Sequence, residues 1–331
     1  MVGLAVCGAI NWDVSCFMDR LPVAGEEVAV RQITRVSGGT GGNVAVAGAR
    51  ILGAEKVALI GAVGQDDIAQ QQIAALEAEG VITEGIQRIA GEESGQAYIL
   101  VDQAGQNVVA SHLGANARLG REYVHRAWVN QQLNQSRSVV ITDPPFEAAE
   151  ELLDVAKQSG VGVLWDPGVL VSQNRDALRT LARKVEVLFL NETEASSLLG
   201  TEQLDTSLQR LQETGFSNRI VLKLGARGAV MFEPEKDLMV EVPALPLEQL
   251  GLNVINTVGC GDAFVGAFAA YHALGANLRK SLIMASAAGC LNATRSETRG
   301  SPERQILEDT EQKCRDLGFA VRQHRHSRAL G

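Results

Sequence analysis

The sequence has no excess of basic residues and no long apolar run. Its 30 Lys and Arg stand against 39 Asp and Glu, so the formal net charge of −9 argues against nucleic acid as the main partner. It contains no uninterrupted stretch of about 18 apolar residues, so we expect no membrane span. The first eight residues lack a basic segment, and we expect them to form a strand rather than a signal peptide.

The sequence has few cysteines, and they lie far apart. The five cysteines, at positions 7, 16, 260, 290 and 314, form no Cys-x-x-Cys pair. An odd number of isolated cysteines is typical of free thiols in a reducing compartment, so a cytoplasmic protein is expected. Hydrophobic residues make up 46% of the 331 positions, which indicates a globular chain with a sizeable core and no internal repeat.

Most of the chain alternates short apolar strands with helical segments. This rhythm predicts a parallel sheet with helices on both faces. The expected strands are 2–10, 57–61, 138–142, 161–165, 186–190 and 219–223, with a hairpin at 229–242. The expected helices are 44–52, 68–79, 119–134, 146–159, 175–183, 192–199, 204–214, 278–293 and one that starts at 302. A tail with His324 and His326 is expected to fray rather than bind metal.

Polar side chains follow several of these strands. They are Asp13, Asp143, Asp166, Asn191 and Glu194. The ligand crevice of such sheets lies at the carboxyl ends of the strands, although single acids there also serve as ordinary turn caps. Segments 14–36 and 97–111 alternate apolar and polar residues instead, which indicates a separate, half-exposed sheet.

Two glycine-rich turns each lead into an apolar helix. The first, Gly-Gly-Thr-Gly-Gly-Asn at 38–43, lacks the Gly-Lys-Ser/Thr ending of a P-loop. A flexible loop is the alternative, but the apolar helix that follows favours a ligand-binding turn. The second runs from Asn256 to Gly266, with Asp262 in the first turn of its helix.

The second turn is suited to phosphate chemistry. Gly259 and Gly261 leave peptide N–H groups bare at a helix N-terminus, which attracts anions. A carboxylate would repel a bound phosphate, so Asp262 fits better as a base that takes a proton from an attacking hydroxyl. A glycine-rich turn with an unremarkable acid remains the other interpretation of these residues alone.

Four motifs in order resemble the ribokinase-like (PfkB) family of carbohydrate and nucleoside kinases over residues 2–318. The turn at 38–43 resembles the first signature of the family and 256–266 the second, Asp-Thr-x-Gly-Ala-Gly-Asp. Asn191 and Glu194 match an Asn-x-x-Glu motif, and 223–228 resembles a nucleotide-side Thr-Leu-Gly-x-x-Gly. The resemblance implies an α/β fold, a three-layer sandwich with a mainly parallel central sheet and a small β-sheet lid. The lid strands would come from 14–36 and 97–111 of one domain spanning 1–331.

The resemblance also assigns residue roles. Asp262 would be the general base, and the amides of Gly259, Cys260 and Gly261 the anion hole. The sugar-binding set would be Asn11, Asp13, Gly39, Gly41, Gly42, Asn43 and Asp143. The nucleotide-binding set would be Asn191, Lys223, Gly225, Gly228 and Asn292, with Glu194 holding Mg²⁺ through water. Asn256 and Thr257 occupy the positions that hold a monovalent cation in ribokinases.

The ribokinase branch matches best, because 11–13, 105–107 and 114–116 resemble its Asn-x-Asp, Gly-Glu-Asn and Gly-Ala-Asn segments. Three positions depart from it. Thr40 replaces Lys, Cys260 replaces Ala, and Asn256 replaces an Asp, which weakens the case for K⁺. The resemblance therefore predicts ATP- and Mg²⁺-dependent phosphorylation of a primary hydroxyl on ribose or a related sugar. A nucleoside kinase and a non-catalytic sugar or nucleotide sensor are the alternatives, and a homodimer through the lid is expected.

Overall fold

The computed structural model describes residues 2–168, 170–173, 175–200 and 218–325. Its centre is one large twisted sheet, ordered β15-β14-β13-β12-β11-β10-β9-β1-β4-β5, with β6 paired to β4. The seven strands from β12 to β5 run parallel, and β13, β14 and β15 extend the sheet antiparallel. The sheet therefore combines the predicted parallel body with the predicted hairpin.

The strands of the body are short and mostly buried on both faces, as their continuous apolar runs require. Their bounds are β1 Leu4–Gly8, β4 Val57–Val63, β5 Val81–Ile82, β6 Ile86–Arg88, β9 Ser138–Thr142, β10 Gly162–Asp166, β11 Val187–Asn191, β12 Arg219–Lys223, β13 Ala229–Glu233, β14 Leu238–Val242 and β15 Arg322–Arg325.

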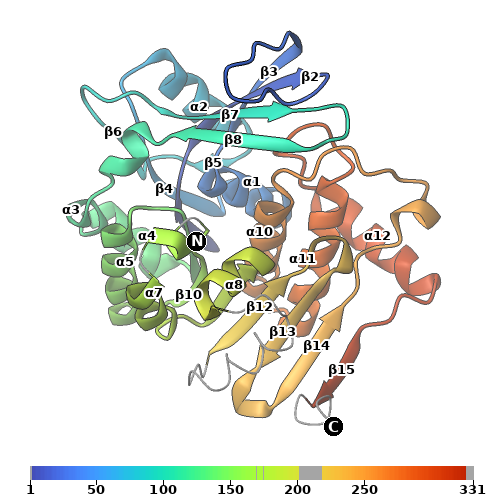
Figure 1. The fold of residues 1–331 in the computed structure, drawn as a ribbon. Helices are drawn as coiled ribbons and strands as arrows, with labels where there is room; N and C mark the ends of the chain where they lie inside the picture. Colours follow the sequence, from blue (N-terminus) through green and yellow to red (C-terminus); the bar gives the residue numbers. More distant parts are fainter. Residues whose placement is uncertain (1, 169, 174, 201–217, 326–331) are drawn as a thin grey trace.

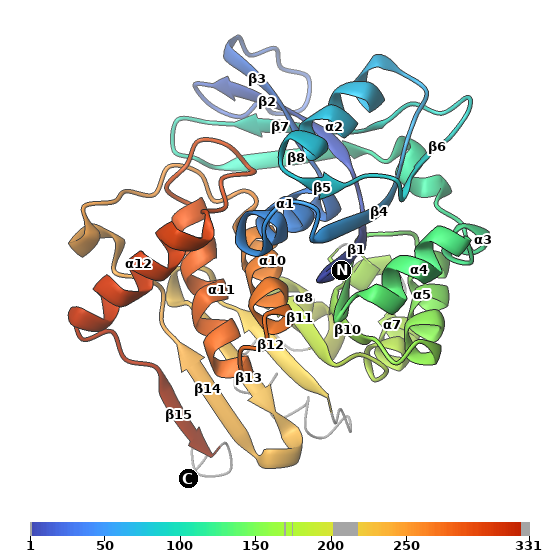
Figure 2. The same cartoon turned by 180° about the vertical axis from the view of Figure 1, so that it is seen from behind.

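Helices cover both faces of this sheet (Figures 1 and 2). A hydrophobic core lies between each face of the sheet and the helices that cover it. The helices on the first face are α3 Arg121–Val124, α4 Ala127–Gln135, α5 Phe146–Gln158, α6 Leu170–Gln173, α7 Arg175–Ala182 and α8 Glu192–Leu199. The helices on the second face are α1 Thr40–Leu52, α2 Asp67–Ala78, α10 Cys260–Ala273 and α11 Leu278–Asn292. Helix α12, Arg304–Asp316, lies against α11. None of the helices in the described ranges is both long and apolar enough to cross a bilayer.

A second, four-stranded sheet lies over one end of the body (Figure 1). Its order is β3-β2-β7-β8, from β2 Asn11–Met18, β3 Val30–Gly38, β7 Gly95–Val101 and β8 Asn107–His112. We call this sheet the lid. Its strands fall in the two segments predicted for it, with bounds that extend a few residues beyond them.

Four local predictions were wrong. The lid begins at Asn11 rather than at about residue 14, because Asn11–Asp13 is already part of strand β2. The first glycine turn already belongs to a helix, because α1 begins at Thr40 rather than Val44. The helix expected over 119–134 is broken between α3 and α4. His324 is not frayed, because β15 pairs with β14 there. The helix expected over 204–214 and the residue His326 lie outside the described residues.

Candidate active site

Between β1 and β2 the chain passes from the body into the lid through two residues, Ala9 and Ile10. The side chain of Asn116 fastens this junction. Its Oδ1 accepts from the Ile10 N–H at 2.9 Å, and its Nδ2 donates to Asn11 Oδ1 at 2.9 Å. Asn11 is thereby fixed at the first position of lid strand β2, just beyond the carboxyl end of β1.

Asp13 lies two residues further along β2, on the same face of the lid as Asn11. Its side chain is buried, and the Thr298 hydroxyl donates to its Oδ2 at 3.2 Å. Burial raises the pKa of Asp13 to about 6, against the opposing hydrogen bond from Thr298 and the charge of Arg299. Asp13 is therefore a poorly solvated acceptor suited to the hydroxyl groups of a ligand.

The glycines of the first turn serve close packing. Gly39 has φ 83°, and a Cβ on it would lie 2.4 Å from the Asn11 nitrogen. The N–H groups of Gly41 and Gly42 donate to the Ala9 carbonyl at 2.9 and 3.3 Å. These two amides are thus already bonded, and the prediction that Gly41 and Gly42 hold sugar hydroxyls needs correction. They let α1 start directly against β1, which brings Asn43 into the site.

Asn43 connects the two glycine-rich motifs. Its Nδ2 donates to Asp262 Oδ2 at 2.8 Å, from the first turn of α1 to the first turn of α10. The two residues are 219 positions apart in the sequence. This contact places the predicted base beside the predicted sugar-binding turn.

The start of α10 presents free peptide N–H groups. Gly259 precedes the helix with φ 79°, and a Cβ there would lie 1.9 Å from the Thr298 carbonyl oxygen, so the turn requires glycine. Within the described residues, the N–H groups of Gly259, Gly261 and Asp262 have no acceptor, whereas that of Cys260 reaches Thr257 O at 3.4 Å. The predicted anion hole therefore has strong donors at Gly259 and Gly261, and a partly engaged one at Cys260.

The pKa of the Asp262 carboxyl lies near neutral pH. Burial raises its pKa to about 7, opposed by the Asn43 hydrogen bond; the charges of Asp166 and Asp143 raise it further, and that of Lys223 lowers it. A carboxyl group with this pKa can both accept and release a proton near pH 7. The Cys260 thiol in the same turn is also buried, which raises its pKa to about 11 and makes it a weak nucleophile.

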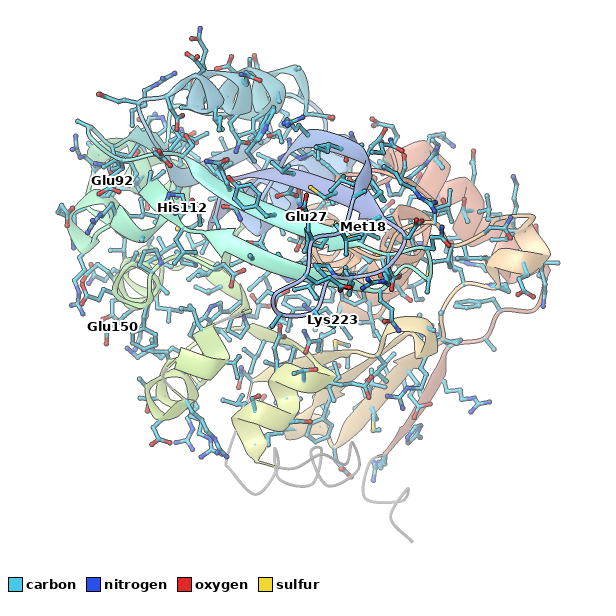
Figure 3. All side chains as sticks on the ribbon, turned by 45° about the horizontal axis from the view of Figure 1, so that its top comes forward. Met18, Glu27, Glu92, His112, Glu150 and Lys223 are labelled. Carbon is cyan, nitrogen blue, oxygen red and sulfur yellow. The ribbon has the colours of Figure 1, made fainter. Side chains whose placement is uncertain are left out.

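Lys223 provides a cation beside the anion hole. Its Nζ lies 3.7 Å from where a Cβ on Gly261 would be, and it donates to Asp166 Oδ2. Burial alone would lower the pKa of Lys223, but the charges of Asp166 and Glu194 outweigh this and raise it. Lys223 is therefore a permanent cation, and Figure 3 shows it below the lid strands, where the lid meets the body.

Asn191 and Glu194 form a capping box at the start of α8. Glu194 Oε2 accepts from the Asn191 N–H at 2.8 Å, and its Oε1 accepts from Asn191 Nδ2 at 2.7 Å. Burial and the nearby charge of Asp166 raise the pKa of Glu194. The two carboxylates, Asp166 and Glu194, thus share one charged cluster with Lys223 at the ends of β10, β11 and β12.

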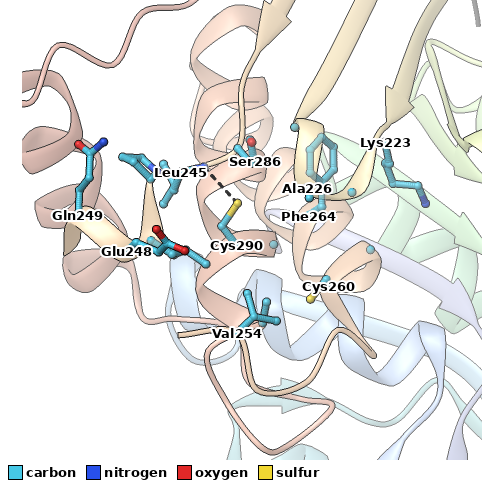
Figure 4. Close-up of a pocket in the computed structure, with 18 residues that line it drawn as sticks. Lys223, Ala226, Leu245, Glu248, Gln249, Val254, Cys260, Phe264, Ser286 and Cys290 are labelled. Atoms are coloured by element: carbon cyan, nitrogen blue, oxygen red, sulfur yellow. Dashed lines mark hydrogen bonds between the residues drawn. The ribbon is translucent and has the colours of Figure 1, made fainter. Parts of the chain in front are cut away.

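A largely apolar slot of about 480 Å³ opens from the start of α10 (Figure 4). Lys223 and Cys260 lie at one end, and Glu248 and Gln249 at the other. Gly225 and Gly228, two of the residues predicted to bind the nucleotide, line it, and both have positive φ. Asn292 does not line it. Its Nδ2 donates to Val258 O at 3.2 Å and supports the α10 turn from behind.

Known proteins resemble the chain along most of its length. The model of the pfkB family carbohydrate kinases matches residues 1–305. The chain belongs to this family. The ATP-dependent ribose-1-phosphate kinase of Halopiger xanaduensis is 31% identical over 91% of this chain and 95% of that protein. The ribokinase of Schizosaccharomyces pombe is 25% identical, over 89% and 93%. Among solved structures, Arabidopsis thaliana ribokinase with ribose and ATP is 24% identical, with a TM-score of 0.82 over 94% and 99%.

The chain is accordingly a sugar kinase of the PfkB family with the ribokinase fold, as its motifs indicated. One family feature does not fit its residues. Asn256 stands at the position where the resemblance predicts the Asp of a monovalent-cation site. Its Nδ2 donates to Ser296 O at 3.0 Å, and its Oδ1 accepts from the Val258 N–H. An N–H group aimed at that carbonyl replaces a charged oxygen ligand. Asn256 therefore joins two loops and leaves no carboxylate for a cation.

Sequence reasoning left three residues out of the site. Asp166 had been noted only as one of several acids after strands, yet it pairs with Lys223. Thr298 and Arg299 come from a loop after α11 that no motif marked, and they reach Asp13 and Asn43. Asp143, which had been predicted, lies close enough to raise the pKa of Asp262 and has φ 49° in its turn.

Proposed function

We propose that this PfkB-family kinase transfers the γ-phosphoryl group of ATP to a primary hydroxyl of ribose or a related small sugar. The observation that carries the proposal is the 2.8 Å hydrogen bond from Asn43 to Asp262. It holds a carboxyl group with a pKa of about 7 between the lid-side polar residues and a helix N-terminus with free N–H groups. A hydroxyl bound near Asp13 would thus meet both a base and an anion hole.

In this mechanism each group of residues has a separate role. Asp13 accepts from sugar hydroxyls, the NH₂ group of Asn11 donates to them, and the two together orient the acceptor. Asp262 takes the proton of the attacking hydroxyl as the bond to phosphorus forms. The N–H groups of Gly259 and Gly261 and the ammonium of Lys223 stabilise the charge on the transferred group. The lid excludes water, which limits hydrolysis of ATP.

Mg²⁺ fits the donor set near Lys223 only through water. The acids Asp166 and Glu194 are oxygen donors of the kind Mg²⁺ prefers. The Glu194 oxygens already accept two hydrogen bonds, and the described ranges contain no group of three acid, histidine or cysteine side chains that could hold a metal ion. A bound Mg²⁺ would keep most of its waters and neutralise charge on the nucleotide phosphates.

A homodimer through the lid is part of the proposal. The register of the lid puts Ile33, Tyr98 and Val108 on the face opposite Asp13. All three are large apolar side chains more than 40% exposed. A partner that covers them would remove apolar surface from water and steady the lid. Sedimentation of the wild-type chain and of Val108→Glu tests this, because the charge should produce monomers.

A nucleoside acceptor is the second candidate. Trp12 and Ile33 lie on the lid face away from Asp13, which argues against them as contacts of such a base. Val109 shares the Asp13 face and is 50% exposed. It leaves an open apolar position beside the sugar site, where a base could lie.

A coupled ADP-release assay with Mg²⁺ and ATP tests the proposal. The acceptors are ribose, ribose 1-phosphate, fructose, 2-keto-3-deoxygluconate, adenosine, cytidine and inosine, with ADP tried as donor in place of ATP. Turnover of ribose or ribose 1-phosphate supports the sugar assignment, and turnover of a nucleoside alone replaces it with the second candidate. Tight binding of one acceptor without any turnover would contradict both and favour a sensor.

A further inference from the structure

The side-chain amide of Asn43 could be oriented in either of two ways, and its neighbours determine which one it adopts. An Asn amide can present either its oxygen or its NH₂ group to a neighbour, and the two orientations have almost the same shape. If the oxygen faced Asp262, it would repel the carboxylate. The NH₂ group must face Asp262 for the base to be held in its ionised form, so something must fix the other end of the amide.

Arg299 is the group at that other end. Its Nε donates to Asn43 Oδ1 at 3.2 Å, and its Nη2 donates to the Gly38 carbonyl at 3.3 Å. A guanidinium group has only donors, so it accepts no hydrogen bond from an amide NH₂ group. Contact with Arg299 therefore turns the Asn43 oxygen outward and its NH₂ group toward Asp262.

The surroundings keep this guanidinium in place. Gly42 makes room for it, because a Cβ on Gly42 would lie 2.8 Å from Arg299 Nη2. The backbone of the loop is held by Arg50, whose Nη1 donates to the carbonyls of Arg299 and Ser301 at 3.1 and 2.6 Å. Arg50 is in turn paired with Glu79 at the end of α2. The loop is thus anchored on its backbone, and the side chain is free to hold Asn43.

We propose that Arg299 is a positioning residue for the phosphoryl-transfer reaction, acting through Asn43 to orient and charge-balance the base Asp262. This inference rests on the proposed function, because it assumes that Asp262 is the base. It goes beyond the family motifs, since Arg299 lies in none of them. Burial lowers the pKa of Arg299 only to about 10, so the side chain remains a cation near neutral pH.

The other titratable groups around Asp262 stay in place when Arg299 is replaced. These groups are Asp143 after β9, Asp166 of β10, Lys223 of β12 and the Cys260 thiol of α10. Loss of the Arg299 cation should therefore raise the pKa of Asp262, and it should also raise the pKa of Asp13, which the charge of Arg299 lowers. Because the ionised carboxylate is the active form, the acid limb of the kcat profile should move to higher pH.

The test compares kcat against pH for the wild type, Arg299→Gln, Arg299→Lys and Arg304→Gln. Glutamine can donate or accept, so Arg299→Gln should lower kcat on the order of tenfold and move the acid limb up by roughly 0.5 to 1 pH unit. Arg299→Lys keeps a donor-only cation and should recover part of both effects. Arg304→Gln removes one positive charge from the same part of the chain, where Arg304 bonds Glu308, and should leave the profile unchanged.

Binding and folding controls separate the possible outcomes. ADP affinity of Arg299→Gln should stay within about twofold of the wild type, because the nucleotide slot does not include Arg299. If that variant fails to fold, Gly42→Ala displaces the guanidinium instead and should move the acid limb in the same direction. An active wild type whose acid limb is unmoved by the folded variant overturns the role of Arg299. A wild type without turnover on any acceptor overturns the proposed function itself.

Discussion

Replacement of Asp262 by Asn should separate stability from activity. The pKa of Asp262 is about 7 in the folded chain, against 3.8 for an unperturbed Asp. Below pH 3.8 both states are protonated, and the group has no effect on folding. As pH rises toward 7, the unfolded chain ionises first, so the folded state loses about 1.4 kcal/mol per pH unit and the loss levels off above pH 7.

The size of the effect follows from those two pKa values. The difference of roughly 3 units amounts to about 4 kcal/mol at pH 8 and about 1.5 kcal/mol at pH 5. Asn is nearly the same shape, cannot ionise, and can accept the Asn43 hydrogen bond through its Oδ1. Asp262→Asn should therefore be more stable than the wild type, by about 2.5 kcal/mol more at pH 8 than at pH 5. For a chain of 331 residues this is a Tm difference of about 3–4 °C.

Thermal unfolding at pH 5 and pH 8 measures the stability change, and the coupled kinase assay measures turnover on the same samples. Loss of a general base should lower kcat by at least about 100-fold. A variant that keeps most of its turnover would refute the base assignment. A gain in Tm that is equal at both pH values would refute the claim that burial of Asp262 strains the folded state.

Three further predictions concern the surrounding residues. Gly259→Ala should lower kcat strongly and destabilise the chain by more than about 2 kcal/mol, because position 259 has a positive φ and an added Cβ would clash with the Thr298 backbone. Steady-state kinetics and urea unfolding measure the two effects. A fully active and stable variant would contradict the turn geometry. Lys223→Met should weaken ATP binding on the order of tenfold or more and leave the paired Asp166 uncompensated, which calorimetry with ATP can detect; unchanged affinity would exclude Lys223 as the phosphate cation. Activity should be indifferent to replacement of Na⁺ by K⁺, because Asn256 donates to Ser296 O, and strong activation by K⁺ would show that a cation displaces that hydrogen bond.

The sequence predicted the features that depend on local pattern. The alternation of strands and helices predicted the parallel body. The two glycine motifs predicted Asp262 and Asn43 as site residues, because glycines and small residues at the start of a helix form a recognisable pattern. What it could not supply were contacts between distant segments. Arg299 and Thr298 lie in a loop with no periodicity, and only the fold brings them to Asn43 and Asp13.

The errors in the prediction have a common physical origin. The lid was predicted to begin at about residue 14, but hydrogen bonds with β3 and β7 make 11–13 the start of its first strand. Gly41 and Gly42 were expected to face the ligand, but their amides bond Ala9. In both cases backbone pairing across the fold decided the structure, and the sequence pattern carries no information about that pairing.

The two-residue link between β1 and β2 has a consequence for how acceptor specificity can change. Asn11 and Asp13, the residues proposed to orient the acceptor, are themselves lid residues, so under the proposed function one element would both hold and cover the acceptor. A lid transplanted from a relative would bring its own acceptor contacts with it, while the phosphate-side residues on α10 and β12 would stay behind. Under the proposed function, exchange of the lid would therefore alter the range of acceptors while the donor side of the site stayed the same.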